Sequence, residues 1–168
     1  AVPAAKAPTL TDQTSLLAFA APFVLYLRTL APTIYNLDSA ELTTAAATGG
    51  LVRATGYPLY LLIGRVWSLL PIGDVGYRMN LLSAVCGALT VALGERILRR
   101  LGVGVWARLA ALGLLAVAQF FWALALIAEV YTLHTAILAG VILALLRWAE
   151  QPAPGRLALA TFLMGIGF

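Results

Sequence analysis

Long stretches without a charged residue constrain the fold of this chain most strongly. About 20 uncharged residues separate Arg108 from Glu129, and about 17 separate Glu129 from Arg147. A membrane helix needs about 20 mostly apolar residues, and its backbone must satisfy its hydrogen bonds within the segment. The whole chain is 62% hydrophobic and 11% charged, whereas a soluble domain has about 25% charged residues. The sequence therefore predicts an all-α, polytopic membrane helix bundle.

Five membrane helices are expected, with approximate bounds 14–31, 78–98, 106–128, 131–148 and 156–168. Residues 1–13 are rich in Pro and Ala and are expected to form a short cytoplasmic tail. Both termini look cut, because the chain starts without Met and stops inside an apolar run. We therefore expect it to be the N-terminal part of a larger membrane protein.

Residues 32–77, between the first two membrane helices, are expected to form one outer loop with two short helices. The first, 38–51, is rich in Ala and Thr and ends at a pair of glycines. The second, 57–70, has a proline in its first turn and another after its end. This second helix is about 21 Å long, shorter than the roughly 30 Å hydrocarbon core. It is therefore expected to lie along the membrane interface.

The distribution of basic residues predicts the orientation. If the N-terminus is cytoplasmic, that side holds seven Lys and Arg residues and the outer side holds four. The cytoplasmic set is Lys6, Arg96, Arg99, Arg100, Arg108, Arg147 and Arg156, and the outer set is Arg28, Arg53, Arg65 and Arg78. This excess follows the positive-inside rule. Asp38, Glu41 and Glu129 then face the same outer compartment.

Two carboxylates in the outer loop are the strongest candidates for chemistry. Asp38 and Glu41 stand three residues apart at the start of the expected helix 38–51. One interpretation is a capping box, in which Asp38 caps the helix and Glu41 returns a hydrogen bond to the cap. The other is catalysis, because a partly desolvated carboxylate near the membrane can accept the proton of a hydroxyl group. Asp38 is then a candidate general base, and a cap residue can serve both purposes.

A second polar group surrounds the start of the expected helix 131–148. Glu129 ends a long apolar stretch, and Tyr131 and His134 lie three residues apart on one helical face. They are either an interfacial aromatic belt with a hydrogen-bonded histidine or substrate-binding residues. With one histidine and a single cysteine, Cys86, the chain has no metal-ligand pattern. No metal, cofactor or intrachain disulfide is expected.

Three arginines, Arg53, Arg65 and Arg78, flank the second short helix of the outer loop. Long basic side chains near an interface commonly reach toward lipid headgroups. The alternative is binding the phosphate of a lipid-linked donor, because guanidinium groups suit phosphate oxygens. The net charge of +4 is spread over helix ends without a basic stripe, so nucleic acid is not an expected partner.

Short motifs in a fixed order carry a resemblance to a known family. They are Asp38-Ser39-Ala40-Glu41-Leu42, Thr55-Gly56-Tyr57-Pro58-Leu59-Tyr60, Gly64-Arg65, Tyr77-Arg78-Met79-Asn80-Leu81-Leu82-Ser83-Ala84 and Ile127-Ala128-Glu129-Val130-Tyr131. Together they resemble the N-terminal region of the glycosyltransferase 117 group, which is related to the transmembrane protein O-mannosyltransferases. The resemblance covers about residues 27–148.

The resemblance implies a GT-C type glycosyltransferase, which takes a sugar from a polyprenyl-phosphate donor and inverts its anomeric centre. In such enzymes the first outer loop holds a catalytic acidic residue; Asp38 occupies that position, with Glu41 beside it. The substrate-binding candidates are Arg65 and Arg78, for the donor phosphate, and Tyr57, Tyr60, Glu129, Tyr131 and His134. Two positions depart from the family, since Arg53-Ala54 stands where His-Pro is usual and His134 where Asn is common.

We therefore expect a glycosyltransferase that transfers a sugar to an acceptor hydroxyl on the outer side of a bacterial plasma (inner) membrane. Its expected partners are a lipid-linked sugar donor, a protein or glycan acceptor, and membrane lipids. The chain alone is expected to be inactive, because such a site would need later helices. Two other interpretations stay open: a transporter or channel whose intramembrane acids line a substrate path, and a non-catalytic membrane subunit.

Overall fold

The computed structural model describes residues 10–36, 38–53 and 56–167, and within these ranges the chain forms α-helices and no strand. The helices are α1 (Leu10–Thr29), α2 (Asp38–Thr48), α3 (Pro58–Trp67), α4 (Val75–Arg100), α5 (Val105–Val117), α6 (Gln119–Ala125), α7 (Val130–Glu150) and α8 (Pro154–Gly167). The predicted all-α helix bundle is confirmed. Most of the expected tail 1–13 lies outside the described residues.

Two of the described helices, α4 and α7, are long and apolar enough to cross a bilayer, and α5 with α6 is a third candidate if the bent pair forms one span. This differs from the five membrane helices expected from sequence. Helix α1 has sufficient length, but a polar run at residues 11–15 and Arg28 reduce its apolar content. Helix α8 has 14 described residues, which is about 21 Å of helix.

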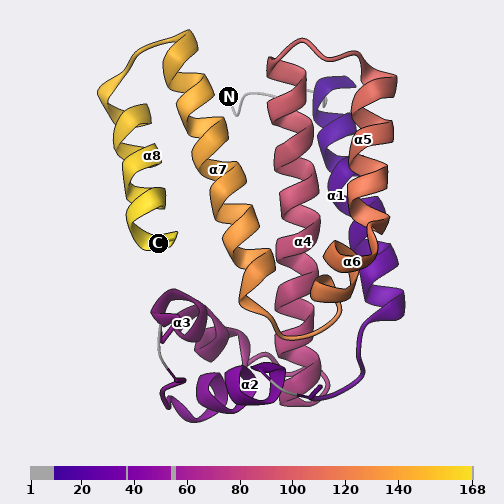
Figure 1. Ribbon diagram of the computed structural model, residues 1–168, viewed down its shortest axis with the longest axis vertical. Coiled ribbons are helices and arrows are strands. Elements are labelled where there is room, and N and C mark those ends of the chain that lie inside the picture. Colours follow the sequence, from indigo (N-terminus) through magenta and orange to yellow (C-terminus); the bar gives the residue numbers. More distant parts are fainter. Residues whose placement is uncertain (1–9, 37, 54–55, 168) are drawn as a thin grey trace, which may run out of the picture.

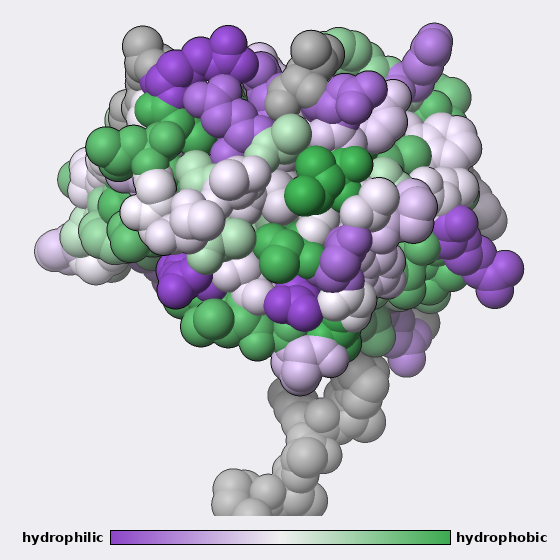
Figure 2. Space-filling view, turned by 90° about the horizontal axis from the view of Figure 1, so that it is seen from below, coloured by the Kyte–Doolittle hydropathy of each residue, from purple (hydrophilic) through white to green (hydrophobic). Residues whose placement is uncertain are grey.

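Helix α4 is the centre of the bundle and packs against α1, α5 and α7, while α8 packs against α7 (Figure 1). Helices α4 and α7 run in one direction, and α1, α5 and α8 run in the other (Figure 1). The short helices α2 and α3 lie across the end of the bundle where α4 and α7 begin. Figure 2 looks at this end and shows hydrophilic side chains interspersed with hydrophobic ones, as expected at a membrane boundary.

The expected single helix over 106–128 is instead broken at Ala118, where α5 and α6 are bent by 64°. Ala118 has an extended backbone, with ψ of 125°. Helix α6 packs on α4, and its Phe121 and Trp122 also contact the cluster around the buried Tyr26 of α1. The indole Nε1 of Trp122 also donates a hydrogen bond of 3.1 Å to Oγ1 of Thr29. The other helix bounds lie within a few residues of expectation.

An apolar cluster holds α2 and α3 against α4. Leu42 and Ala46 of α2, and Tyr60 of α3, are buried with Met79 of α4. Gly64 permits this approach, because a Cβ there would lie 2.7 Å from Cε of Met79 and 3.0 Å from Cβ of Ala46. Burying one leucine side chain contributes about 1.5–3 kcal/mol, so a few such contacts fix short helices that would not be stable alone.

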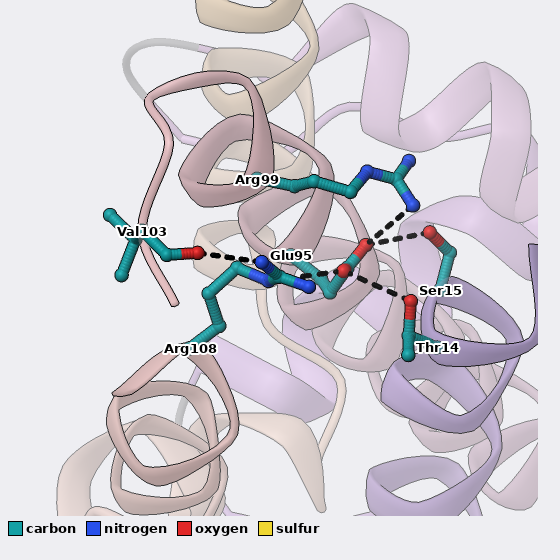
Figure 3. Close-up of polar contacts among 6 residues, drawn as sticks. All are labelled: Thr14, Ser15, Glu95, Arg99, Val103 and Arg108. Carbon is teal, nitrogen blue, oxygen red and sulfur yellow. Dashed lines mark hydrogen bonds and ion pairs between the residues drawn. The ribbon is translucent and has the colours of Figure 1, made fainter. Parts of the chain in front are cut away.

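At the opposite end, a buried ion cluster joins α1, α4 and α5 around Glu95 (Figure 3). Ser15 donates a hydrogen bond of 2.7 Å to Oε2 of Glu95, and Thr14 donates one of 3.2 Å to Oε1. The guanidinium groups of Arg99 and Arg108 lie 3.8 Å and 3.4 Å from the same carboxylate. Sequence analysis did not single out Glu95.

Candidate functional site

Asp38 and Glu41, in the first turn of α2, are joined by one arginine from the loop that follows this helix. Nη2 of Arg53 lies 2.6 Å from Oδ1 of Asp38, and Nε of Arg53 lies 2.9 Å from Oε2 of Glu41. The backbone N–H of Arg53 also donates a hydrogen bond of 2.9 Å to Oε1 of Glu41. Arg53 therefore fixes the spacing of the two carboxylates by three contacts.

This arrangement differs from a capping box. A capping box would turn the Glu41 carboxylate back to the start of α2, but both of its oxygens bond Arg53. Asp38 is exposed at the helix start, and Arg53 is exposed above it. The cluster therefore stands at the surface, where water and a substrate can reach it.

Glu129 comes to the same place from a distant part of the chain, as the residue before α7. Ser83 of α4 holds its backbone, because Oγ accepts from the Glu129 N–H at 3.1 Å and lies 3.3 Å from its carbonyl oxygen. Burial, and then the negative charge of Asp38, raise the pKa of the Glu129 carboxyl above its ordinary value. Glu129 therefore keeps its proton to a higher pH than an ordinary glutamate does.

A cavity of about 240 Å³, which we call the carboxylate cavity, lies between these groups. Its lining residues are Asp38, Glu41, Leu42, Val52, Arg53, Tyr57, Glu129, Val130 and Tyr131. The structure thus brings together all three acids singled out in the sequence, with two of the tyrosines. A hydroxyl-bearing molecule in this cavity would meet carboxylates, a guanidinium group and aromatic rings.

A second cavity of about 600 Å³, the apolar cavity, adjoins the first and lies between α3, α7 and α8. Tyr57, Val130 and Tyr131 line both cavities. Tyr60 and His134 line only the apolar cavity. Burial raises the pKa of Tyr60 well above its usual value, so this side chain is a neutral phenol. The candidate residues therefore divide between two adjoining spaces.

Arg65 and Arg78 lie outside both cavities, and backbone carbonyls occupy their guanidinium groups. Arg65 donates to the carbonyl of Ala47, which joins α3 to α2. Arg78 donates to the carbonyls of Ile72, Ser68 and Gly73, at 2.7, 2.6 and 2.9 Å. These two arginines hold the helices and the loop before α4, and the arginine of the carboxylate cavity is Arg53.

Helix α4 supplies further anchoring residues that sequence analysis quoted within a motif without giving them a role. Asn80 is buried, and its Nδ2 donates to the carbonyls of Ala31 and Thr33, each at 2.9 Å. It thereby ties the segment after α1 to α4, as Ser83 ties Glu129. An amide side chain near the start of an apolar helix, Asn80, was the signal in the sequence that could have predicted this role, because a buried amide needs hydrogen-bond partners.

No metal site is apparent in the part of the chain that the structure describes. Within residues 10–36, 38–53 and 56–167, no three His, Cys, Asp or Glu side chains come close enough to hold an ion. The chemistry that these residues offer is acid–base and electrostatic: carboxylates that accept a proton and a guanidinium group that binds an anion.

The chain matches a protein-family model and a curated protein. The family model described as "Protein O-mannosyl-transferase TMEM260 N-terminal domain" matches residues 38–168. The chain is also similar to protein O-mannosyl-transferase TMEM260 of the mouse, Mus musculus, with 32% identity over 141 residues. These residues are 83% of this chain and 20% of the mouse protein, so the chain spans about a fifth of that relative's length. No solved structure matches the chain.

Proposed function

The chain belongs to the family of TMEM260 N-terminal domains, and from this premise we propose that it forms part of a membrane glycosyltransferase. The enzyme takes a sugar from a polyprenyl-phosphate donor and transfers it to an acceptor hydroxyl. The observation that carries this proposal is the carboxylate cavity, in which Asp38, Glu41, the half-buried Glu129 and Arg53 meet.

Asp38 is the general base of the proposed reaction. Without substrate Arg53 engages Oδ1 of this carboxylate, and with the donor bound the carboxylate is free to face the acceptor hydroxyl. As the carboxylate takes the hydroxyl proton, the acceptor oxygen attacks the anomeric carbon. The bond from that carbon to the phosphate oxygen breaks, and polyprenyl phosphate leaves with the electron pair. Attack opposite to the leaving group inverts the anomeric centre, as in GT-C type enzymes.

Arg53 has two successive roles in this proposal. Without substrate it balances the charges of Asp38 and Glu41. With a donor bound, its guanidinium turns to the donor phosphate. A guanidinium group and a phosphate pair well because two N–H groups can donate parallel hydrogen bonds to two phosphate oxygens. The move leaves Asp38 free to take a proton, and Glu41 keeps its contact with the Arg53 backbone N–H.

The apolar cavity supports a lipid-linked donor. It is larger than the carboxylate cavity, and Tyr57 and Tyr131 form the boundary between them. A polyprenyl chain fits an apolar space that opens between membrane helices, while its phosphate and sugar extend past the tyrosines. Tyr60 and His134 would contact the part of the donor nearest the lipid.

The reaction is proposed for the outer face of the membrane. This proposal is supported by the positive-inside rule, because Arg96, Arg99, Arg100, Arg108, Arg147 and Arg156 lie toward the end away from α2 and α3. Placement in a bacterial plasma membrane rests on the family resemblance.

Asp38→Asn tests the proposal. In the protein that carries this chain, sugar transfer from polyprenyl-phosphate mannose should fall by about 100- to 10,000-fold, the usual effect of losing a general base. Mannose is the first sugar to test because of the mouse relative's name. Asn keeps a helix-starting side chain, so expression should remain.

Asp74→Asn is the matched control. Asp74 is likewise an exposed carboxylate at a helix start, where its Oδ1 accepts from the Tyr77 N–H at 2.7 Å, and it does not line the carboxylate cavity. Its transfer rate should stay near that of the unchanged protein. Near-normal transfer by Asp38→Asn, or an equal loss in both variants, would contradict the role of Asp38 as the base.

The transporter interpretation has a weaker basis in the structure. Transporters commonly bind substrate at broken helices. The break in this chain, at Ala118 between α5 and α6, lies outside the lining of the carboxylate and apolar cavities. The cavities are instead lined by α2, α3, α7, α8 and the adjoining loops, which is the arrangement that the glycosyltransferase proposal uses.

A further inference from the structure

A third cavity, the arginine cavity, lies at the end of the bundle opposite to α2 and α3, where α4 and α7 end and α8 begins. Its volume is about 370 Å³. It is lined by Arg100 of α4, Arg147 and Glu150 of α7, and Arg156 of α8. Three guanidinium groups thus converge on one space with a single carboxylate.

Helix capping explains only part of this cluster. Arginines near helix C-termini are stabilised by the helix dipole. Arg156 fits that explanation, because it donates to the carbonyls of Arg147 and Gln151 and to Oε1 of Gln151, each at 2.9 Å. Arg100 pairs with Glu150. The Arg147 guanidinium has no hydrogen bond or ion pair among the described residues, so positive charge in this cavity is not neutralised by the chain.

The surroundings of the cavity are those of a membrane surface. Leu159 of α8 lines it, and the exposed Trp148 follows the lining residue Arg147 in α7. Tryptophan at a helix end is typical of the headgroup region. Basic cavities between membrane helices bind the phosphates of anionic lipids. The volume of about 370 Å³ leaves room for a phosphate and its glycerol.

We propose that the arginine cavity binds the headgroup phosphate of an anionic phospholipid, in the leaflet opposite to the carboxylate cavity. Arg147 is the main ligand, and Arg100 is the second, after the phosphate displaces Glu150 from it. The acyl chains lie along the apolar faces of α7 and α8. This site is separate from the proposed catalytic one and stands whether or not the chain acts as a glycosyltransferase.

Lipid binding by the detergent-purified protein that carries this chain tests the proposal. Short-chain phosphatidylglycerol, phosphatidylcholine and inorganic phosphate are titrated separately, and complexes are counted by native mass spectrometry. Phosphatidylglycerol should bind most tightly. Arg147→Gln should weaken it about fivefold, the effect of one basic residue at an anionic surface. Arg28→Gln, an exposed arginine near the other end, should change nothing.

Glu150→Gln should change the affinity for phosphatidylglycerol in the opposite direction to Arg147→Gln. This test does not depend on whether the Arg147→Gln variant folds. It removes the carboxylate that competes for Arg100, so phosphatidylglycerol should bind more tightly than to the unchanged protein. The proposal is overturned if Glu150→Gln weakens binding or if phosphatidylcholine binds equally well. Inorganic phosphate binding as tightly as the lipid would identify a free-anion site instead, and absence of binding would also overturn the proposal.

Discussion

The two ends of the bundle each hold a cluster of carboxylates and arginines, and the clusters differ in burial. At the α2 end, Arg53, Asp38 and Glu41 have side chains that are 72%, 64% and 34% exposed. At the other end, Glu95 is 1% exposed and its partner Arg108 is 12% exposed. Similar residue types therefore occur in a wet and in a dry environment within one small chain.

Burial decides what such a cluster can do. An exposed ion pair contributes about 0–1 kcal/mol, because water competes for both partners. Arg53 can therefore leave its carboxylates when a substrate offers another anion. Removing one partner of a buried pair costs about 3–5 kcal/mol, because the other charge stays without solvent. The Glu95 cluster is consequently suited to holding helices together, and the Arg53 cluster to exchange of partners.

Glu95→Ala should have the largest effect on stability, a loss of about 3–5 kcal/mol, because Arg108 would remain buried without its partner. Thermal unfolding of the detergent-purified protein measures it. Glu150→Ala is the matched control, since Glu150 pairs with Arg100 at the same end but is 45% exposed. That control should lose less than about 1 kcal/mol. Equal losses in the two variants would refute the distinction by burial.

Glu129→Gln should have an intermediate, pH-dependent effect, because Glu129 is half-buried. Burial and the charge of Asp38 raise its pKa in the folded state above the ordinary 4.5. Below pH 4.5 both states hold the proton. As pH rises past 4.5, the unfolded state loses its proton first, so native stability falls until the raised pKa is passed and then levels off.

The Gln variant has no such proton to lose. Its melting temperature should match that of the unchanged protein near pH 4 and exceed it at pH 8, after both curves are measured in the same detergent. A gap that is the same at both pH values would mean that the pKa of Glu129 is not raised by folding.

Arg53→Gln should have the smallest effect on stability, below about 1 kcal/mol, because its ion pairs are exposed. Transfer activity should nevertheless fall about tenfold or more, since one hydrogen bond to a charged group is worth about 1.5–3 kcal/mol. Arg28→Gln, on the last turn of α1, is the control and should change neither quantity. If the Arg53 variant instead unfolds readily and keeps its activity, the cluster of Arg53, Asp38 and Glu41 has a structural role only.

The positions of the acidic residues along the sequence were sufficient to predict that Asp38, Glu41 and Glu129 lie at the same end of the bundle. Asp38 and Glu41 begin a helix and Glu129 precedes one, so each stands at the boundary of an apolar segment. Alternating helices then bring these boundaries to the same end of the bundle. Such positions follow from helix length alone, which a sequence shows directly.

Which side chain pairs with each acidic residue was harder to predict, because it depends on contacts between residues that are distant in the sequence. Arg53 was one of three similar arginines, and a turn with Gly49 at φ of 71° precedes the segment that brings it back to α2. Glu95 is buried by Ser15, which is 80 residues away in the chain. The break at Ala118 has no Pro or Gly at that position, and α6 beyond it packs on residues of α4 and α1 that are distant in the sequence.

The start of α4 has a consequence for how the acids keep their spacing. Arg78, Asn80 and Ser83 fix, respectively, the loop after α3, the segment leading to α2 and the backbone of Glu129. All three lie within two turns of one rigid helix, where each residue advances the rotation by about 100°. The rotation of α4 about its own axis therefore sets the distance between Glu129 and the acids of α2. The loops on either side of α4 can vary in length without separating Glu129 from α2.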